Sequence, residues 1–351
     1  IEGDAHIQSV GFYDNDQGAI IFDLNDCDEA YLAPFYWDLI RFSTSIYLIQ
    51  NLVDFNMTNS EADELVEYFL EKYQKELEDN SKKVLKKSEL SGFTKETLED
   101  LEKDRDNSYL LGKWTKIISG SRKFDLNNVK LTSLSSSESN EINQYWSTYY
   151  NQVKDSMPPI YFNVKDKAKR LKSGLGSLGV QKFYILIEGP TSANNDDVIL
   201  EVKEQKLPSL FLSEFLLESQ YYSYFSNHAK RAMIAYKAMG KDVDNHLGTL
   251  ISNNKSYLVR KISIYKENYE PKHFNSESDF KNFLKFSAKA LAHAHNRSDN
   301  DYNSSYVSYE FSKTAIDAIK QWNQAKTKIK NMAKNYSQQV MQDYQYFLEL
   351  Y

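Results

Sequence analysis

The 351-residue sequence contains one cysteine, Cys27, and no long apolar run. A single cysteine excludes an intramolecular disulfide and a cysteine-based zinc site, and it is typical of a reducing compartment. No stretch approaches the roughly 18 to 20 apolar residues needed to span a bilayer, and the first residues lack the charged-then-apolar pattern of a secretion signal. We therefore expect a cytoplasmic protein without membrane association. Residue 1 is isoleucine, which leaves room for a segment that precedes it.

The chain also lacks an excess of basic residues. It has 43 Lys and Arg against 49 Asp and Glu, a formal net charge of −6. Nucleic-acid binders rely on neutralising phosphates, so this balance argues against a nucleic-acid partner. Hydrophobic residues make up 41% and charged residues 26%, which is typical of a globular protein and not of a disordered one. The length suits one large bilobal domain or two domains of ordinary size.

Apolar periodicity predicts a mixed α/β protein whose first part covers residues 1–155. Two short apolar runs within 10–24 flank a turn at Gly18 and predict a β-hairpin. Helical spacing follows in several places: after Pro34, from Ser60 with Asp63 at capping-box spacing, and over 94–106. The serine-rich segment 133–141 is predicted to be a loop, followed by a helix that ends before Pro158 and Pro159.

The second part, residues 156–270, is predicted to be a small antiparallel sheet. Apolar runs between residues 160 and 204 indicate three strands in a meander, joined by a glycine-rich loop and a hairpin. Helices return after Pro208, and strand-like runs recur within 256–266. The third part, 271–351, is predicted to be helical, with one apolar stripe and one or two long helices over 309–351; the stripe consists of Phe280, Leu284, Ala288, Leu291 and His295.

An acidic cluster follows the N-terminal hairpin. Asp23, Asp26, Asp28 and Glu29 lie within seven residues that include no Lys or Arg. Two such charges about 5 Å apart, at an effective dielectric near 20, repel by about 3 kcal/mol. A partly buried cluster therefore requires compensating cations, either a metal ion or basic side chains from elsewhere in the chain. A solvated acidic loop is the alternative interpretation.

A glycine segment in the middle of the chain is the second candidate for chemistry. Gly174, Gly176 and Gly179, with Ser177 among them, lie between two predicted strands, and glycines at this spacing let backbone amides approach an anion. The segment is not a dinucleotide-binding fingerprint, because a strand and not a helix follows it. Lys203 lies one strand further on. A glycine loop above phosphates and a strand lysine beneath them form the phosphate-holding half of a kinase-like site.

The N-terminal motifs resemble two families. "GDAHIQS", residues 3–9, is similar to the Gly-Asp-x-His-x-x-Asn catalytic loop of aminoglycoside and choline phosphotransferases, and Asp26 and Asp38 match the spacing of that family's metal-binding Asp and later Asp-Leu. From residue 3 onwards, the chain resembles the bacterial family of unknown function DUF2252. The matching segments are "GDAH", "FDLNDCDEA", "YWDL", "GLGSLGVQKFYILIEG", "LEVKEQ" and "ALAHAHNRSD".

These resemblances imply a circularly permuted kinase-like fold with a small antiparallel-sheet lobe and a large helical lobe. The glycine loop and its lysine follow the catalytic loop in this chain, whereas they precede it in an ordinary kinase. The helix ending "ALAHAHNRSD" would take the place of the helix that leads into the catalytic loop. Opening the chain between those two segments leaves a three-dimensional site unaltered.

The implied function is ATP- and Mg²⁺-dependent phosphoryl transfer to an unknown hydroxyl acceptor, either a small molecule or a protein. The implied roles are as follows: Asp4, with His6 beside it, at the substrate hydroxyl; Asp26 and Asp28, with Ser9, at Mg²⁺; Gly174, Gly176, Ser177, Gly179 and Lys203 at the nucleotide; and Glu214 or Glu218, on the following helix, pairing with that lysine. Asp38 is expected to brace the catalytic loop through hydrogen bonds, and His295, on an apolar helix face, to be a satisfied core histidine.

One departure and two alternatives qualify the resemblance. Ser9 stands where the family pattern has asparagine, and its hydroxyl is a shorter and weaker metal ligand than an amide oxygen. A nucleotide-binding pseudokinase or regulatory module without turnover is therefore the first alternative. The second is a metal-dependent hydrolase that uses the carboxylates alone and gives Lys203 no role.

Overall fold

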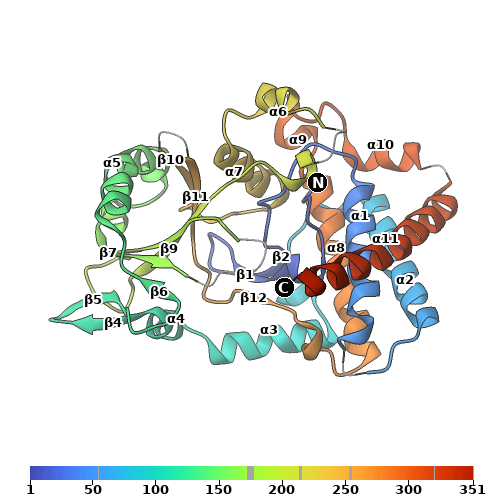
Figure 1. Ribbon diagram of the computed structural model, residues 1–351, viewed down its shortest axis with the longest axis horizontal. Coiled ribbons are helices and arrows are strands. Elements are labelled where there is room, and N and C mark those ends of the chain that lie inside the picture. Colours follow the sequence, from blue (N-terminus) through green and yellow to red (C-terminus); the bar gives the residue numbers. More distant parts are fainter. Residues whose placement is uncertain (54, 172–177, 213–215, 253–254, 320, 351) are drawn as a thin grey trace.

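The computed structural model describes residues 1–53, 55–171, 178–212, 216–252, 255–319 and 321–350. Most helices gather at one end of the molecule and the six-stranded sheet lies at the other, with the four-stranded sheet between them (Figure 1). The mixed α/β class expected from the sequence is confirmed. Among the described residues, the helices fall short of the combined length and apolar character that a bilayer span requires.

A four-stranded antiparallel sheet occupies the middle of the molecule (Figure 1). Its order is β12-β1-β2-β3, where the strands are β12 (Glu267–Asn268), β1 (Val10–Asp14), β2 (Ile20–Leu24) and β3 (Leu85–Lys86). The hairpin predicted over 10–24 is confirmed, and Gly18 adopts a φ of +74° in its turn. Strand β12 comes late in the sequence, and its pairing with β1 holds residues 267–268 against the N-terminal hairpin.

The helical end is built around α8 (Glu277–Arg297), which packs against β2 and several helices. The other helices there are α1 (Tyr36–Leu48), α2 (Asn59–Glu78), α3 (Gly92–Asp104), α9 (Asn300–Asn303), α10 (Phe311–Ala318) and α11 (Trp322–Leu350). The apolar stripe predicted on α8 is buried throughout. Phe42 and Phe69 stack between α1 and α2, with ring centroids 4.4 Å apart. Burial of such stripes supplies most of the stability of these helices.

The predicted starts of two helices, α2 and α5, were wrong, and a threonine or serine cap explains each difference. Helix α2 is capped by Thr58, whose side chain accepts a hydrogen bond from the Glu61 N–H, and not by Ser60. Helix α5 (Ser136–Val153) starts inside the serine-rich segment that the sequence suggested was a loop. There Ser135 and Glu138 form a capping box, so the hydroxyl groups satisfy free amides at a helix start.

The six-stranded antiparallel sheet lies at the other end of the molecule, in the order β10-β11-β9-β8-β7-β6. Its strands are β6 (Leu131–Thr132), β7 (Val164–Arg170), β8 (Lys182–Ile187), β9 (Val198–Glu204), β10 (Gly248–Ser252) and β11 (Lys255–Lys261). The predicted meander is confirmed as β7-β8-β9. Phe183, Ile185 and Leu200 on one face form a core with α5.

The opposite face of this sheet is covered partly by α4 (Asn107–Trp114) and by the hairpin of β4 (Thr115–Ile118) and β5 (Ser121–Phe124). Residues 107–153, which the sequence assigned to the first part, thus pack on the six-stranded sheet. Helices α6 (Glu218–Tyr224) and α7 (His228–Met239) lie between β9 and β10 in sequence. Short 3-10 turns are at Ile7–Ser9, Ile49–Asn51, Lys87–Glu89, Lys154–Ser156, Pro159–Phe162, Ser209–Leu212 and Pro271–His273.

Candidate functional site

The loop that carries the Gly-Asp-Ala-His motif is held by a carboxylate from α1. Asp38 accepts hydrogen bonds from the backbone N–H groups of Glu2, at 2.7 Å, and Gly3, at 3.0 Å. Gly3 has a φ of +88°, and a Cβ at this position would lie 2.2 Å from the carbonyl oxygen of Glu29. Only glycine fits this close approach without a shift of the backbone. The expectation that Asp38 braces the loop is confirmed.

A chain of buried hydrogen bonds connects this brace to α8. The Tyr73 hydroxyl lies 2.8 Å from His295 Nδ1, and His295 Nε2 lies 3.0 Å from the Asp38 carboxylate. Burial lowers the pKa of His295, so the imidazole is neutral near pH 7. A neutral ring then accepts from Tyr73 and donates to Asp38, which satisfies all three groups. His295 is a bonded core histidine, as expected.

Asp4 lies at the surface of this loop, and its main partner is an arginine that the sequence reasoning missed. Arg41 Nε donates to Asp4 Oδ1 at 2.6 Å, and the two side chains are 43% and 36% exposed. Arg41 is three residues beyond Asp38 on α1, and that helical spacing places both side chains towards the loop. The spacing was visible in the sequence.

His6 and Ser9 both stabilise the turn that follows Asp4. His6 Nδ1 accepts the N–H of Gln8 at 3.1 Å, while its Nε2 lies 3.8 Å from Asp4. Burial lowers the pKa of His6, which favours the neutral ring. The Ser9 hydroxyl accepts from the His6 N–H and donates to the His6 carbonyl, each at 3.0 Å. Because Ser9 is buried and its hydroxyl is bonded within the turn, it is poorly placed to bind a metal ion.

Three members of the acidic cluster have donors from other parts of the chain. Arg297 at the end of α8 lies 2.6 Å from Asp23, and the N–H of Ser209 lies 2.5 Å from Glu29. Lys203 from β9 donates to Asp28. These contacts supply the compensation that the cluster requires.

Asp26 is the exception among the described residues. Its one hydrogen bond is accepted by Oδ1 from the N–H of Asp28 at 3.2 Å. Strand β2 ends at Leu24, so Asp26 and Asp28 lie in the loop that follows this strand. The half-buried Asp26 carboxylate thus remains available to an added cation.

Lys203 and Asp28 form one of the contacts between the six-stranded sheet and the N-terminal loop. Their side chains are 14% and 17% exposed, and Gln205 Nε2 also donates to Asp28 at 3.1 Å. Burial alone would lower the pKa of Lys203, but the carboxylates of Asp28 and Asp26 raise it well above its ordinary value. Lys203 is therefore a fixed cation within the field of both aspartates.

The remaining nucleotide-binding predictions have different outcomes. Glu218 is the exposed first residue of α6, and the structure pairs Lys203 with Asp28 instead. Gly179 has a φ of +73° and open space where a Cβ would be, consistent with a turn between β7 and β8. The other predicted residues, Gly174, Gly176, Ser177 and Glu214, lie outside the described residues.

Further charged side chains surround this contact and were not identified from the sequence. Glu201 is two residues from Lys203 on β9, a spacing that places both on one face of the strand. Arg260 lies opposite Glu201 on β11, donates to the carbonyl of Asn25 at 3.2 Å and lies 3.6 Å from Glu201. Arg231 is buried and donates to the backbone carbonyl of Asp28 at 2.5 Å. Arg260 fixes the acidic loop against β11, and Arg231 fixes it against α7.

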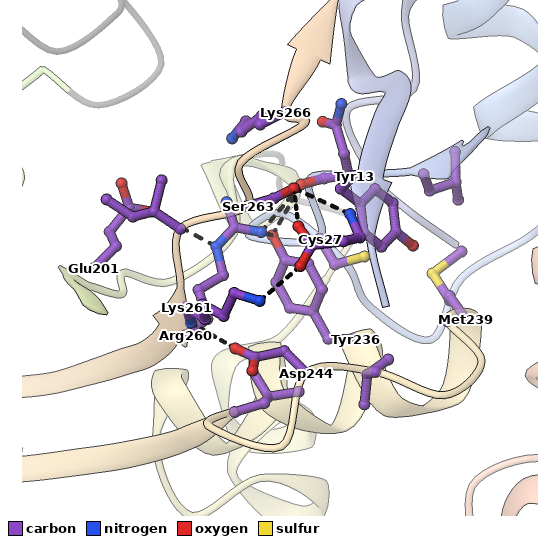
Figure 2. A pocket seen from close by; sticks show the side chains of 17 residues that line it. Tyr13, Cys27, Glu201, Tyr236, Met239, Asp244, Arg260, Lys261, Ser263 and Lys266 are labelled. Atoms are coloured by element: carbon purple, nitrogen blue, oxygen red, sulfur yellow. Dashed lines mark hydrogen bonds and ion pairs between the residues drawn. The ribbon is translucent and has the colours of Figure 1, made fainter. Parts of the chain in front are cut away.

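A cavity of about 90 Å³ lies behind the acidic loop, large enough for several water molecules. Figure 2 shows Arg260 inside it, between Glu201 and Tyr236, with Cys27 and Met239 on the opposite wall. Burial raises the pKa of Cys27, so this residue is a thiol and not a reactive thiolate. The cavity separates the four-stranded sheet from β11 and the linker that follows it.

The negative charge of Asp26 affects the pKa of Lys203 on β9 and of Glu2 beside the Gly-Asp-Ala-His motif. This charge raises the pKa of Lys203 and contributes to raising the pKa of Glu2, whose side chain accepts the Asp4 N–H at 3.0 Å. Burial is the largest cause of the raised Glu2 pKa, followed by Asp38 and Asp4, and these causes favour the neutral acid at Glu2. Within the described part of the chain, no three His, Cys, Asp or Glu side chains converge as a metal-binding group.

Comparison with known proteins gives one match. No curated protein and no solved structure is similar enough to the chain to count as a match. The family model described as an uncharacterized protein conserved in bacteria, DUF2252, matches residues 1–350. This match covers the acidic loop, the glycine segment, Lys203 and the helical end, and therefore the chain belongs to the DUF2252 family.

Proposed function

We propose that the chain is an ATP- and Mg²⁺-dependent phosphotransferase with a circularly permuted kinase-like fold. The observation that carries the proposal is the contact between Lys203 and Asp28. It joins β9, the second strand after the glycine segment, to the acidic loop that follows the Gly-Asp-Ala-His motif. Phosphoryl transfer depends on positioning and electrostatic stabilisation, and these are the properties that such a junction supplies.

The position of α8 supports the proposed permutation. In the kinase-like scheme, a helix leads into the catalytic loop, but here α8 and that loop are at opposite ends of the sequence. His295 near the end of α8 bonds to Asp38, and Asp38 holds the N–H groups of Glu2 and Gly3. The end of the helix and the start of the loop are thus connected through one carboxylate. A single chain in the usual order would need only a short link between them.

The residues present fit a magnesium nucleotide. Mg²⁺ is commonly held by one or two carboxylates together with substrate phosphates and water. Asp26 would hold it, with Asp28 beside it, and when bound the ion would neutralise phosphate charge. Lys203 is a permanent cation that would contact the phosphates, and its position is fixed by Asp28, which also accepts a hydrogen bond from Gln205.

Asp4 would orient the acceptor hydroxyl and receive its proton. Its carboxylate is partly exposed, which an incoming acceptor requires, and Arg41 restricts its orientation. His6 would keep the turn in place through its bond to the Gln8 N–H and carry no proton itself. The acceptor is a molecule with a hydroxyl group, either small or a protein side chain.

A nucleotide-binding protein without turnover is the second candidate, and Ser9 favours it. The Ser9 hydroxyl is buried and bonded within its own turn, so it is poorly placed to supply the metal ligand that asparagine provides in the family pattern. The hydrolase hypothesis gains no support, because it gives no role to Lys203, which contacts the acidic loop at Asp28.

Transfer of labelled γ-phosphate from ATP tests the proposal. The full chain is incubated with γ-labelled ATP, Mg²⁺ and a pool of small alcohols, sugars and proteins, and label is followed into each fraction and into water. We expect Mg²⁺-dependent transfer that Asp4→Asn reduces at least 100-fold while ATP binding is unchanged. Asp16→Asn, an exposed change in the hairpin turn, is the matched control. ATP binding without transfer to any pool would leave the non-catalytic candidate.

A further inference from the structure

A second hollow lies on the charged face of the six-stranded sheet, between α4 and the linker that follows β11. Its volume is about 260 Å³. Strands β8 and β9 contribute Lys182, Tyr184 and Glu201, and Lys182 lies directly opposite Lys203 across this strand pair. The hollow therefore adjoins the Lys203 contact along the sheet. It is defined by its own lining residues, however, and neither Lys203 nor the acidic loop is among them.

The lining is strongly basic in a chain whose net charge is −6. One carboxylate, Glu201, faces the basic side chains, which are Arg105, Lys113, Arg170, Lys182 and Lys266. Glu201 is already engaged, because Lys182 lies 3.3 Å and Arg260 3.6 Å from it. These cations keep the pKa of Glu201 low despite its burial. A local excess of positive charge remains.

The partners of the basic side chains show which charges are uncompensated. Arg105 forms an ion pair with Glu267. Lys113 and Arg170 instead lie over the ring of Trp114, at 5.6 and 5.0 Å from its centroid, and Arg170 also donates to the backbone carbonyls of Leu171 and Lys130. A cation over an aromatic face is held in place but keeps its full charge.

Lys266 is the clearest case of an uncompensated charge. Among the described residues, its ammonium has neither a hydrogen bond nor an ion pair, although it lines this hollow and the cavity of Figure 2. Although the residue as a whole is exposed, desolvation of its ammonium by the surrounding walls, followed by the nearby charge of Arg260, lowers its pKa to about 8. An anion placed in the hollow would relieve this like-charge repulsion.

We propose that this hollow binds the phosphate groups of an anionic ligand. Several unneutralised cations around one cavity match a group with several negative oxygens better than a single carboxylate, and arginine and lysine are the usual partners of phosphate. The phosphate groups belong either to a nucleotide that extends from the Lys203 contact or to a separate phosphorylated molecule. The inference goes beyond the proposed function, because it requires neither phosphoryl transfer nor Mg²⁺.

The experiment uses inorganic tripolyphosphate as the probe and calorimetric titration of the full chain, without Mg²⁺. Lys113→Gln and Lys266→Gln remove exposed ammonium groups that make no ion pair among the described residues, so both variants should fold normally. Lys116→Gln is the matched control, because this lysine pairs with Asp125 on the same end of the molecule but does not line the hollow.

We expect tripolyphosphate to bind the unaltered chain and each pocket variant to lose about tenfold or more in affinity, while the control retains it. No binding, unchanged affinity in both pocket variants, or an equal loss in the control would overturn the proposal. Competition then identifies the source: mutual exclusion of tripolyphosphate and Mg²⁺–ATP assigns the phosphates to the nucleotide, and simultaneous binding assigns them to a second molecule. Loss of Mg²⁺–ATP binding in Lys203→Ala reports separately on the proposed function.

Discussion

Removing Lys203 should leave the Asp28 carboxylate nearly buried without its cation. Two unit charges in contact, about 3 Å apart, attract by about 5 kcal/mol at an effective dielectric of 20. The net cost of losing one partner is smaller, because the two side chains keep 14% and 17% exposure and Gln205 still donates to Asp28. We expect Lys203→Met to lower the free energy of unfolding by about 2 to 3 kcal/mol, below the cost of breaking a fully buried pair.

A double-mutant cycle measures the pair itself. Urea unfolding of Lys203→Met, Asp28→Asn and the double variant should give a coupling energy of about 1.5 to 2.5 kcal/mol, since each single change removes the same interaction. The exposed pair of Lys87 and Glu102, with nitrogen and oxygen 2.7 Å apart, is the control and should couple by less than about 0.5 kcal/mol. A Lys203–Asp28 coupling no larger than that of the surface pair would refute the contact on which the site depends.

Three further predictions concern the fold around the site. Thr58→Ala removes a bonded cap of α2 and should lower the free energy of unfolding by about 1 kcal/mol, whereas Ser91→Ala should cost less, because Ser91 precedes α3 without a side-chain cap bond; thermal unfolding compares them. Gly3→Ala must displace the Glu29 carbonyl, whereas the added methyl of Gly18→Ala meets open space and causes only backbone strain of about 1 to 2 kcal/mol. The midpoint of urea unfolding should therefore be at a lower urea concentration for Gly3→Ala than for Gly18→Ala. Equal midpoints would contradict the packing of the loop. The pKa of His295 is lowered in the folded state, so the unfolded chain takes up the proton first and the free energy of unfolding should fall as the pH drops below about 6.5. His295→Gln should reduce the slope of the free energy of unfolding against pH by up to about 1.4 kcal/mol per pH unit. Identical slopes in the two proteins would refute the neutral ring.

Local patterns in the sequence predicted the elements that bear the site. The hairpin at 10–24 and the stripe on α8 follow from alternation and helical periodicity, and both are buried as expected. The start of α5 was missed because serine-rich segments suit both loops and helix caps, and the choice depends on whether Glu138 completes a capping box. Local patterns also could not show that residues 107–153 pack on the six-stranded sheet, because that packing depends on contacts with distant strands.

Long-range pairing was beyond local patterns. The Lys203 partner is Asp28, 175 residues away, and nothing in the spacing around either residue distinguishes it from Glu218. Arg41 and Glu201 could have been predicted from the sequence. Arg41 follows Asp38 at helical spacing, and Glu201 precedes Lys203 at the spacing of one strand face. The charged hollow could not be predicted without the register of β8 and β9, which places Lys182 opposite Lys203.

Calorimetric titration of ATP into the full chain, with and without Mg²⁺, tests most directly whether the acidic loop and the β9 lysine form one nucleotide site. We expect Mg²⁺ to strengthen ATP binding at least tenfold, Asp26→Asn to remove that enhancement, and Lys203→Met to weaken binding under both conditions. Binding that is independent of Mg²⁺ and equal in all three proteins, or no binding at all, would contradict the account.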